Sequence, residues 1–489
     1  MMKRLHPLIL FILITIPFVL WAKVQILPTF DDWSTLSSPN TDPDFLPYFM
    51  RYGNVWRPFD ALMGYIVGLN PRLFPVLNHI IIFIGHLLGT LMVFLLCGKA
   101  RFNRNAQAIA TTFFYLSPCV LGTVLACDSL NQVYSQLWGL VAIWSYMHYS
   151  DTRKYVLWAF CVFLAALSKE NGIAWAVVPP IFAWAIQEKK TDGIHIKNFP
   201  LKEIGWGILI AITYFVVRIL IPKTEIFNPD YETFNIMKNV KGFVIWIGYT
   251  WFSADYISLV HEPSRNIPLF IITLLLSLPF VYILFIRNYK LWKHRTFLGL
   301  IVCAVITVSP NLLISLTVMN AYASLGMFAI LVGFIIHSSS PSLIPPRGED
   351  SALPLGGVGG GLFCLYILSA LIVGFHHWKA SYDSSMIGKE MAQSVLKQST
   401  KPVDKAYCIV IEDDYPKFSS FCEKPAYAFG WGTAVRYENE YQWPKELNDT
   451  TVDYIINTQQ ITELTQQAFQ KGYQSVWIVD GKDVKVVEK

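Results

Sequence analysis

Residues 8–33 read LILFILITIPFVLWAKVQILPTFDDW. The apolar run Leu8–Trp21 is a candidate for a membrane-crossing helix, and the acidic pair Asp31-Asp32 follows it, with Trp33 next in the chain. Two negative charges just beyond a first membrane crossing are costly to keep. The pair therefore indicates chemistry at the membrane face opposite the N-terminus.

The composition is that of an integral membrane protein. Of 489 residues, 54% are apolar and 15% charged, and the mean hydropathy is +0.41. Soluble domains are about 45–50% apolar and about 25% charged. The net charge of +5 is modest and does not favour nucleic acid as a partner. The eight cysteines show no metal-ligand spacing.

The apolar segments predict an α-helical multi-pass membrane protein. The first segment lacks a good cleavage site at Trp21-Ala22-Lys23-Val24 and is expected to remain as an anchor. We predict about eleven transmembrane helices, at 7–22, 76–97, 106–125, 132–149, 155–168, 173–187, 204–221, 267–286, 296–316, 321–337 and 355–375.

Basic residues in short loops predict the orientation, because cytoplasmic loops carry an excess of Lys and Arg. The segment 240–254 is read as an interfacial or re-entrant helix within an external region, 223–266. The N-terminus is then cytoplasmic, and the compact size favours a bacterial inner membrane. The basic loops contain Lys3, Arg4, Lys99, Arg101, Arg104, Arg153, Lys154, Lys189, Lys190, Lys197, Lys202, Arg287, Lys290, Lys293 and Arg295.

Two external regions are long. The first, 23–75, is rich in Pro, Asp and aromatic residues. The second is the tail, 376–489, which is expected to be periplasmic or extracellular and to form a small α/β domain. Its predicted elements are helices at 383–397 and 461–471 and strands at 407–411, 475–479 and 484–487. Cys408 and Cys422 lie in this tail; a disulfide and two separate thiols both remain open.

Asp31 and Asp32 are the first candidates for chemistry. A carboxylate can act as a general base toward an acceptor hydroxyl, and two adjacent carboxylates can also hold a divalent cation. The alternative is a pair of solvated loop charges. Trp33 beside them suits stacking on a sugar or anchoring at the interface.

Three further candidates are an arginine and two histidines, of which His79 is expected near the outer face and His86 deeper in the span. Arg57 is suited to gripping a phosphate, although it can also extend toward lipid headgroups. His79 and His86 lie on one face of the second span, where ionisable residues are functional candidates. For both histidines, the alternative to a functional role is packing within the helix bundle.

A short loop and the seventh span add more candidates. Lys169 and Glu170, between two short spans, either neutralise each other or hold an anion. Arg218 lies about one turn from the outer end of its span, where a charge needs a partner or a cavity. Asp255 and Tyr256 are weaker candidates in the second external region.

In their order and topology these pieces resemble the GT-C superfamily of membrane glycosyltransferases, especially the branch similar to protein O-mannosyltransferases. The acidic motif and the loop Leu167-Ser168-Lys169-Glu170-Asn171-Gly172-Ile173 carry most of the resemblance, which covers residues 1–375. One departure is Asn320-Ala321-Tyr322, where many relatives have Arg-Tyr. The tail matches no accessory domain of the family.

The resemblance implies an inverting transfer from a polyprenyl-phosphate sugar donor to an acceptor hydroxyl on protein, lipid or cell-envelope glycan. Asp31 or Asp32 would be the catalytic base, with a slight preference for Asp32. Arg57, Lys169 and Arg218 would bind the donor phosphate, and the apolar spans would hold the polyprenyl tail among membrane lipid. A divalent cation at the acidic pair stays open.

Three other functions compete with this one. A transporter or flippase of a lipid-linked sugar often shows internal repeats and polar groups near the midplane, whereas here the polar candidates gather toward one face. An O-antigen ligase or polymerase is expected to carry its main external loop late in the chain. A non-catalytic envelope scaffold would work through the tail.

Overall fold

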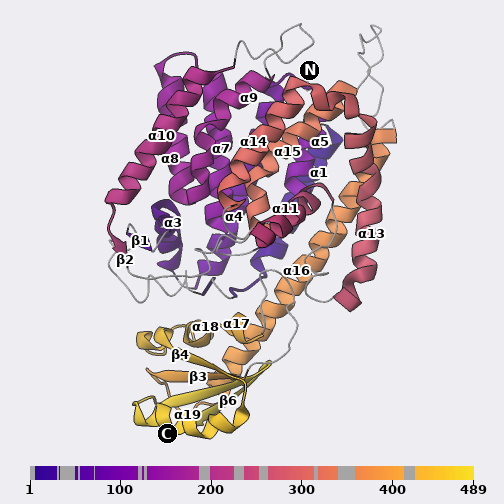
Figure 1. The fold of residues 1–489 in the computed structure, drawn as a ribbon. Coiled ribbons are helices and arrows are strands. Elements are labelled where there is room, and N and C mark those ends of the chain that lie inside the picture. The colour runs from indigo at the N-terminus through magenta and orange to yellow at the C-terminus, as the bar shows by residue number, and fades with distance from the viewer. Residues whose placement is uncertain are drawn as a thin grey trace.

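The chain is a bundle of helices with a small mixed sheet at one end (Figure 1). The computed structural model describes residues 6–29, 32–33, 50–52, 55–70, 72–118, 120, 124–125, 129–186, 199–224, 236–252, 263–312, 318–339, 358–411 and 425–489.

Each apolar segment singled out in the sequence contains a helix. Six helices in the described part of the chain are long and apolar enough to cross a membrane; the count of eleven crossings stays a prediction. The helices are α1 Pro7–Val24, α4 Phe74–Lys99, α5 Arg104–Leu116, α7 Leu130–His148, α8 Thr152–Ser168, α9 Val178–Ile186, α10 Leu201–Leu220, α13 Pro263–Tyr282, α14 Arg295–Leu312, α15 Val318–Ser339 and α16 Val358–Gln398.

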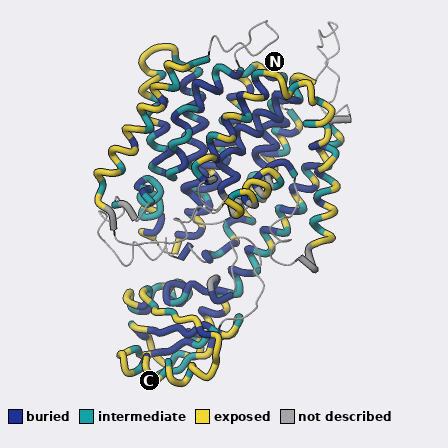
Figure 2. The backbone as a smooth tube through the Cα atoms, viewed as in Figure 1, coloured by how far each residue is buried: buried dark blue, intermediate teal, exposed yellow. Residues whose placement is uncertain are grey.

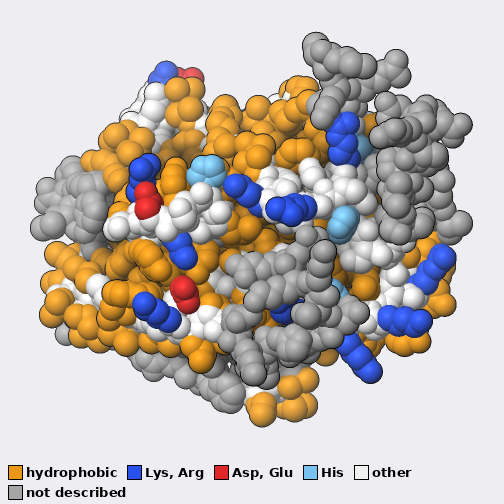
Figure 3. Space-filling model, turned by 90° about the horizontal axis from the view of Figure 1, so that it is seen from above, with side chains coloured by type: hydrophobic (Ala, Val, Ile, Leu, Met, Phe, Trp, Pro, Cys, Tyr) orange, Lys and Arg blue, Asp and Glu red, His pale blue; other side chains and the backbone are white. Residues whose placement is uncertain are grey.

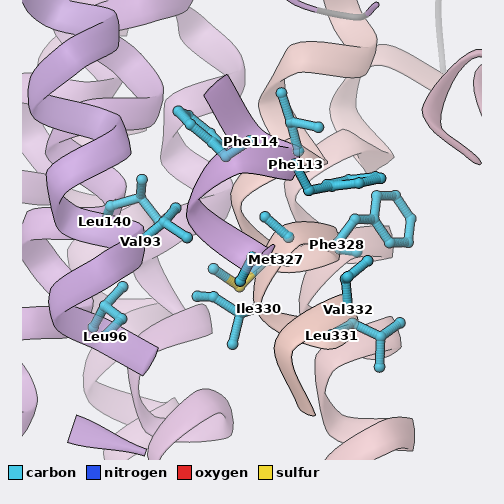
Figure 4. Packing of buried hydrophobic residues seen from close by; sticks show 14 of the residues in the cluster. Val93, Leu96, Phe113, Phe114, Leu140, Met327, Phe328, Ile330, Leu331 and Val332 are labelled. Carbon is cyan, nitrogen blue, oxygen red and sulfur yellow. The ribbon is translucent and has the colours of Figure 1, made fainter. Parts of the chain in front are cut away.

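The core of the bundle lies where α4, α5, α7 and α15 meet (Figure 4). Phe114 of α5, Leu140 of α7 and Met327 of α15 are among its fully or almost fully buried side chains. These central helices are largely buried, whereas α10 and α13 expose much of their apolar surface (Figure 2). That pattern fits a bundle whose outer helices face lipid, since lipid tails are as apolar as the exposed side chains.

One end of the bundle gathers the predicted basic loops. His6 contacts Asn105 at 3.3 Å, Nζ of Lys99 donates to Nδ1 of His148 at 3.4 Å, and the backbone N–H of Asn103 donates to His337 at 3.2 Å. These contacts join the start of α1 and the nearby ends of α4, α5, α7 and α15. Lys and Arg side chains are prominent on this face (Figure 3).

The segment expected to be interfacial or re-entrant forms α11, Ile236–Trp251. Its apolar side packs on α15: the indole N–H of Trp246 donates to Oγ of Ser324 at 2.9 Å. Trp251 lies edge-on to Phe285 and Phe328, with ring centroids 4.5 and 4.7 Å away. The helix is therefore anchored to the bundle by its tryptophans.

The tail contains a four-stranded sheet of order β4-β3-β5-β6. Strand β3 (Ala406–Ile411) is parallel to β4 (Thr451–Ile455) and β5 (Ser475–Asp480), and β6 (Asp483–Glu488) is antiparallel to β5. Helix α19 (Ile461–Gln470) lies in the connection between β4 and β5. The predicted strands and this helix are present; β4 was missed.

The predicted amphipathic helix of the tail is not a separate element. It is the second half of α16, which runs without a break through residue 375. Two short helices, α17 (Pro425–Phe429) and α18 (Trp431–Glu438), lie between the sheet and the bundle. In Figure 1 the tail lies at the end of the bundle opposite the N-terminus. A shared apolar cluster contains Trp33, Val67, Phe74, Phe429 and Val435.

Candidate functional site

Glu170 lies at the centre of a group of polar side chains at the end of the bundle opposite the N-terminus. It lies two residues after the last residue of α8 and begins the 3-10 helix η2, Glu170–Ala176. Its Oε1 accepts a hydrogen bond from the backbone N–H of Trp56, and its Oε2 accepts one from Nε–H of Arg57, both at 2.9 Å. The predicted phosphate ligand Arg57 and the predicted loop are therefore in direct contact.

Burial would raise the pKa of Glu170, but Arg57 beside it and hydrogen bonds from Arg57, Trp56 and its own backbone outweigh this and lower the pKa. The carboxylate is therefore charged at neutral pH. The two paired side chains are 24% and 22% exposed, so the pair lies at the boundary of the packed structure. A guanidinium offers five N–H donors, and Arg57 can hold Glu170 and a further anion together.

Arg218 lies four residues after Tyr214 in α10, on the same face of the helix. The buried phenol of Tyr214 donates to the backbone carbonyl of Ala166 at 3.3 Å, and its ring lies 5.7 Å from that of Trp56. At the end of α10, the strand β2 (Lys223–Thr224) pairs in parallel with β1 (Arg51–Tyr52). Residues 51–52 are thus joined to the segment that follows α10.

Lys169 makes a second set of hydrogen bonds next to Glu170. The sequence analysis did not predict its partners. Its Nζ donates to Oδ1 of Asn131 at 3.4 Å, and Nδ2 of Asn131 donates to Oδ2 of Asp60 at 3.4 Å. Asn131 lies in the first turn of α7, and Asp60 in the first turn of α3, Pro58–Gly68. An acidic residue three positions after Arg57 was a signal that could have indicated Asp60.

Asp32 lies in a tight turn next to the tail. Its backbone N–H donates to the carbonyl of Thr29, and its Oδ2 accepts the N–H of Thr29, both at 3.0 Å. The residue is 5% exposed, so it is not the freely solvated charge of the alternative interpretation. Asp31, Asp255 and Tyr256 lie outside the described residues.

Trp33 occupies a different position from the one expected. Its indole N–H donates to the carbonyl of Ala428 at 3.2 Å, and its ring packs edge-on against Tyr437. With 7% of its surface exposed, it serves as a contact with the tail. The expectation that it stacks on a sugar or anchors at the interface is therefore wrong for this conformation, because protein covers the indole.

Both predicted histidines are hydrogen-bonded inside the bundle. Nε2 of His79 lies 2.9 Å from the carbonyl oxygen of Ile26, which ties the segment after α1 to α4. Nδ1 of His86 lies 2.9 Å from the hydroxyl of Tyr322. These contacts favour the packing role for His86 and give His79 a part in holding the segment that leads to Asp32.

The structure places the candidate residues in two groups at the same end of the bundle. One contains Arg57, Lys169, Glu170 and Arg218, and the other contains Asp32, Trp33 and His79. Asn320, at the departure from the family pattern, accepts a hydrogen bond from Nε2 of Gln132 at 3.1 Å. Among the described residues, no group of three or more His, Cys, Asp or Glu side chains could hold a metal ion.

No protein-family model matches the chain, and neither does any curated protein. Two solved proteins have similar folds. ArnT from Cupriavidus metallidurans, crystallised with undecaprenyl phosphate, has a TM-score of 0.46 and 12% identity over 98% of this chain and 97% of its own. The oligosaccharyltransferase AglB from Archaeoglobus fulgidus, in complex with an inhibitory peptide and a dolichol-phosphate, has a TM-score of 0.43 and 11% identity over 93% of this chain and 66% of its own. TM-scores below 0.5 carry no argument about substrate or mechanism.

Proposed function

We propose that the chain is an inverting glycosyltransferase of the membrane. It would move a sugar from a polyprenyl-phosphate donor to an acceptor hydroxyl at the face opposite the N-terminus. The observation that carries the proposal is the ion pair of Arg57 with Glu170, which also accepts the backbone N–H of Trp56. The ring of Trp56 lies 5.7 Å from that of Tyr214, which precedes Arg218 by about one turn of α10.

The network suits a phosphate because it combines fixed cations with a boundary position. Arg57 is paired with Glu170, and Lys169 precedes Glu170 in sequence. Arg218 lies about one helical turn after Tyr214 in α10. Glu170 orients the guanidinium of Arg57 through Nε. Cations held in place before the reaction stabilise negative charge as it develops on a leaving group, without the cost of reorganisation.

In the proposed reaction, Asp32 or Asp31 takes the proton of the acceptor hydroxyl. The hydroxyl oxygen attacks the anomeric carbon from the side opposite the phosphate. A new carbon–oxygen bond forms as the bond from the anomeric carbon to the phosphate oxygen breaks. Polyprenyl phosphate leaves with the bonding pair, and Arg57, Lys169 and Arg218 bind its charge.

The test uses full-length protein in lipid nanodiscs and a panel of undecaprenyl-phosphate and dolichol-phosphate sugars. We expect release of the lipid phosphate from at least one donor. General-base catalysis contributes about 100-fold to 10,000-fold, so Asp32→Asn or Asp31→Asn should reduce the rate by at least about 100-fold. Arg57→Ala and Arg218→Ala should weaken binding of undecaprenyl phosphate itself.

The matched control is Arg153→Ala, which removes an exposed arginine at the opposite end of the bundle, where it pairs with Asp151. It should bind and react as the wild type does. Movement of a lipid-linked sugar between leaflets without release of lipid phosphate would indicate a flippase. Undiminished release in both Asp variants would show that the base is assigned wrongly. Addition of EDTA tests whether a divalent cation is needed.

A further inference from the structure

The contact between Trp33 and the tail joins the proposed base to a part of the chain about 400 residues away in sequence. The indole N–H donates to Ala428 at 3.2 Å, and the indole ring lies 5.8 Å from Tyr437 at an interplanar angle of 67°. A second contact joins the same faces, since Arg72 and Glu440 form an ion pair at 3.0 Å. Helix α18 is therefore held at both ends against the bundle.

Two properties of Gly430 allow this contact. Its φ of +66° lies in the left-handed region, which favours glycine. A Cβ at this position would lie 2.1 Å from Cδ1 of Trp33, well inside van der Waals contact. The indole therefore packs directly on the bare backbone at the start of α18, and any side chain there would push it away.

Asp32 is held from two directions. On one side its turn with Thr29 continues into Ile26, whose carbonyl is hydrogen-bonded to His79 of α4. On the other side Trp33 is the next residue, and adjacent Cα atoms are only about 3.8 Å apart. A displacement of the Trp33 backbone by the tail therefore moves Asp32 as well.

We propose that Trp33 is a positioning residue through which the tail, at Ala428, Gly430 and Tyr437, sets the place of the Asp32 carboxylate. The inference rests on the proposed function, in which this carboxylate is the base. The tail is then required for the rate of transfer and not for holding the donor phosphate, whose ligands lie in the other group of residues.

The experiment compares Gly430→Ala with Gly472→Ala in full-length protein. Gly472 also has a positive φ, +91°, but an added Cβ there would have no atom within 4 Å. Both variants share the backbone penalty of about 1–2 kcal/mol for a left-handed residue, and only the first displaces Trp33. Trp33→Ala and the double variant Trp33→Ala/Gly430→Ala complete the set.

Two measurements are made on each variant. The first is hydrogen exchange at the amides of Thr29 and Asp32, which reports local opening without any substrate. The second is transfer in the donor assay, separated into kcat and the affinity for undecaprenyl phosphate. A misplacement of about 1 Å can cost about 100-fold in rate. We expect Gly430→Ala and Trp33→Ala to exchange faster and to lose roughly tenfold to 100-fold in kcat, with donor affinity unchanged.

Gly472→Ala should resemble the wild type in both measurements, and the double variant should be no worse than Trp33→Ala, because the clash has gone. Trp33→Phe, which keeps a ring, should restore part of the rate. Wild-type exchange and kcat in Gly430→Ala, with Asp32→Asn inactive, would overturn the positioning role and leave the base in place. An active Asp32→Asn would instead overturn the base assignment.

Discussion

Nε of Arg57 lies 2.9 Å from Oε2 of Glu170, across 113 positions in sequence. The sequence of the loop at residues 168–172 allowed two interpretations. In one, Lys169 and Glu170 neutralise each other, and in the other they hold an anion. The structure instead pairs Glu170 with Arg57, while Lys169 donates to Asn131. Arg57 and Lys169 therefore have different hydrogen-bond partners. We infer from this that the polar site is wider than a single ion pair.

Replacing Glu170 by Gln should destabilise the protein in a pH-dependent way. Because the folded-state pKa of Glu170 lies below its ordinary value of 4.5, its contribution is complete above that value and is lost as the pH falls through the folded-state pKa. The cost at neutral pH should lie between that of an exposed pair, about 1 kcal/mol, and that of a broken buried pair, about 3–5 kcal/mol.

Thermal unfolding of wild type and Glu170→Gln from pH 7 to pH 3 measures this. The gap in Tm should be constant from pH 7 to pH 5 and should close at lower pH. Asp383→Asn, which breaks an exposed pair with Lys379, should shift Tm very little. A gap that stays constant to pH 3 would contradict the lowered pKa.

Gly139→Ala should disturb the Glu170 loop from a distance. Gly139 in α7 faces Trp175 of η2, and a Cβ there would lie 2.1 Å from Cδ2 of that indole. Overpacking of a core costs about 1–3 kcal/mol, and the strain falls on the helix that begins with Glu170. We expect a lower Tm and weaker binding of undecaprenyl phosphate.

The control is Gly98→Ala in α4, where an added Cβ would have no atom within 4 Å. Alanine is favoured over glycine inside a helix by about 0.5–1 kcal/mol, so this variant should be as stable as the wild type or more so. If the two variants have the same Tm and bind undecaprenyl phosphate equally well, the Trp175 side chain moves aside without displacing η2.

Tyr322→Phe should destabilise the centre of the bundle. The hydroxyl of Tyr322 lies 2.9 Å from Nδ1 of His86, and both residues are 1% exposed. Removing one partner of a buried hydrogen bond leaves the other unsatisfied, at a cost of about 1–3 kcal/mol. Tyr289→Phe, at a residue 60% exposed, is the control. Differential scanning fluorimetry of both variants in detergent should show a drop in Tm for the first alone.

Much of the fold could be predicted from the sequence because membrane helices are long and apolar. Helices occupy the predicted segments, and the strands of the tail that alternate or are wholly apolar, such as β3 and β5, were found. Strand β4 was missed because it is a short edge strand with three exposed residues and an aspartate at its centre. The continuity of α16 was missed because its second half becomes polar where it leaves the bundle.

The site was harder to predict because its geometry depends on contacts between distant elements. The sequence could nominate Arg57, Glu170 and Arg218 as charges near one face, but the ion pair of Arg57 with Glu170 is a consequence of packing. Asn131 is an ordinary polar residue in sequence and gains significance only as the partner of Lys169 and Asp60. The contact of Trp33 with the tail could not be predicted, because nothing in the sequence shows that Gly430 leaves room for its ring.

Cys408 should be an unreactive thiol in the folded protein. It is fully buried in β3 and unpaired, and burial raises its pKa well above 9.0. Since the thiolate is the reactive form, maleimide at pH 7.5 should label wild type and Cys408→Ala equally before unfolding. Cys422, for which the sequence leaves a disulfide with Cys408 or a separate thiol open, lies outside the described residues.

After unfolding in detergent without reductant, the two proteins should differ in a way that separates the alternatives. If Cys408 is a free thiol, the wild type takes up one more maleimide than Cys408→Ala. If the two cysteines form a disulfide, the wild type takes up one fewer, because the variant releases Cys422. Intact-protein mass spectrometry counts the labels. We expect the wild type to carry one more, since β3 buries Cys408 as a small apolar side chain between its neighbouring strands.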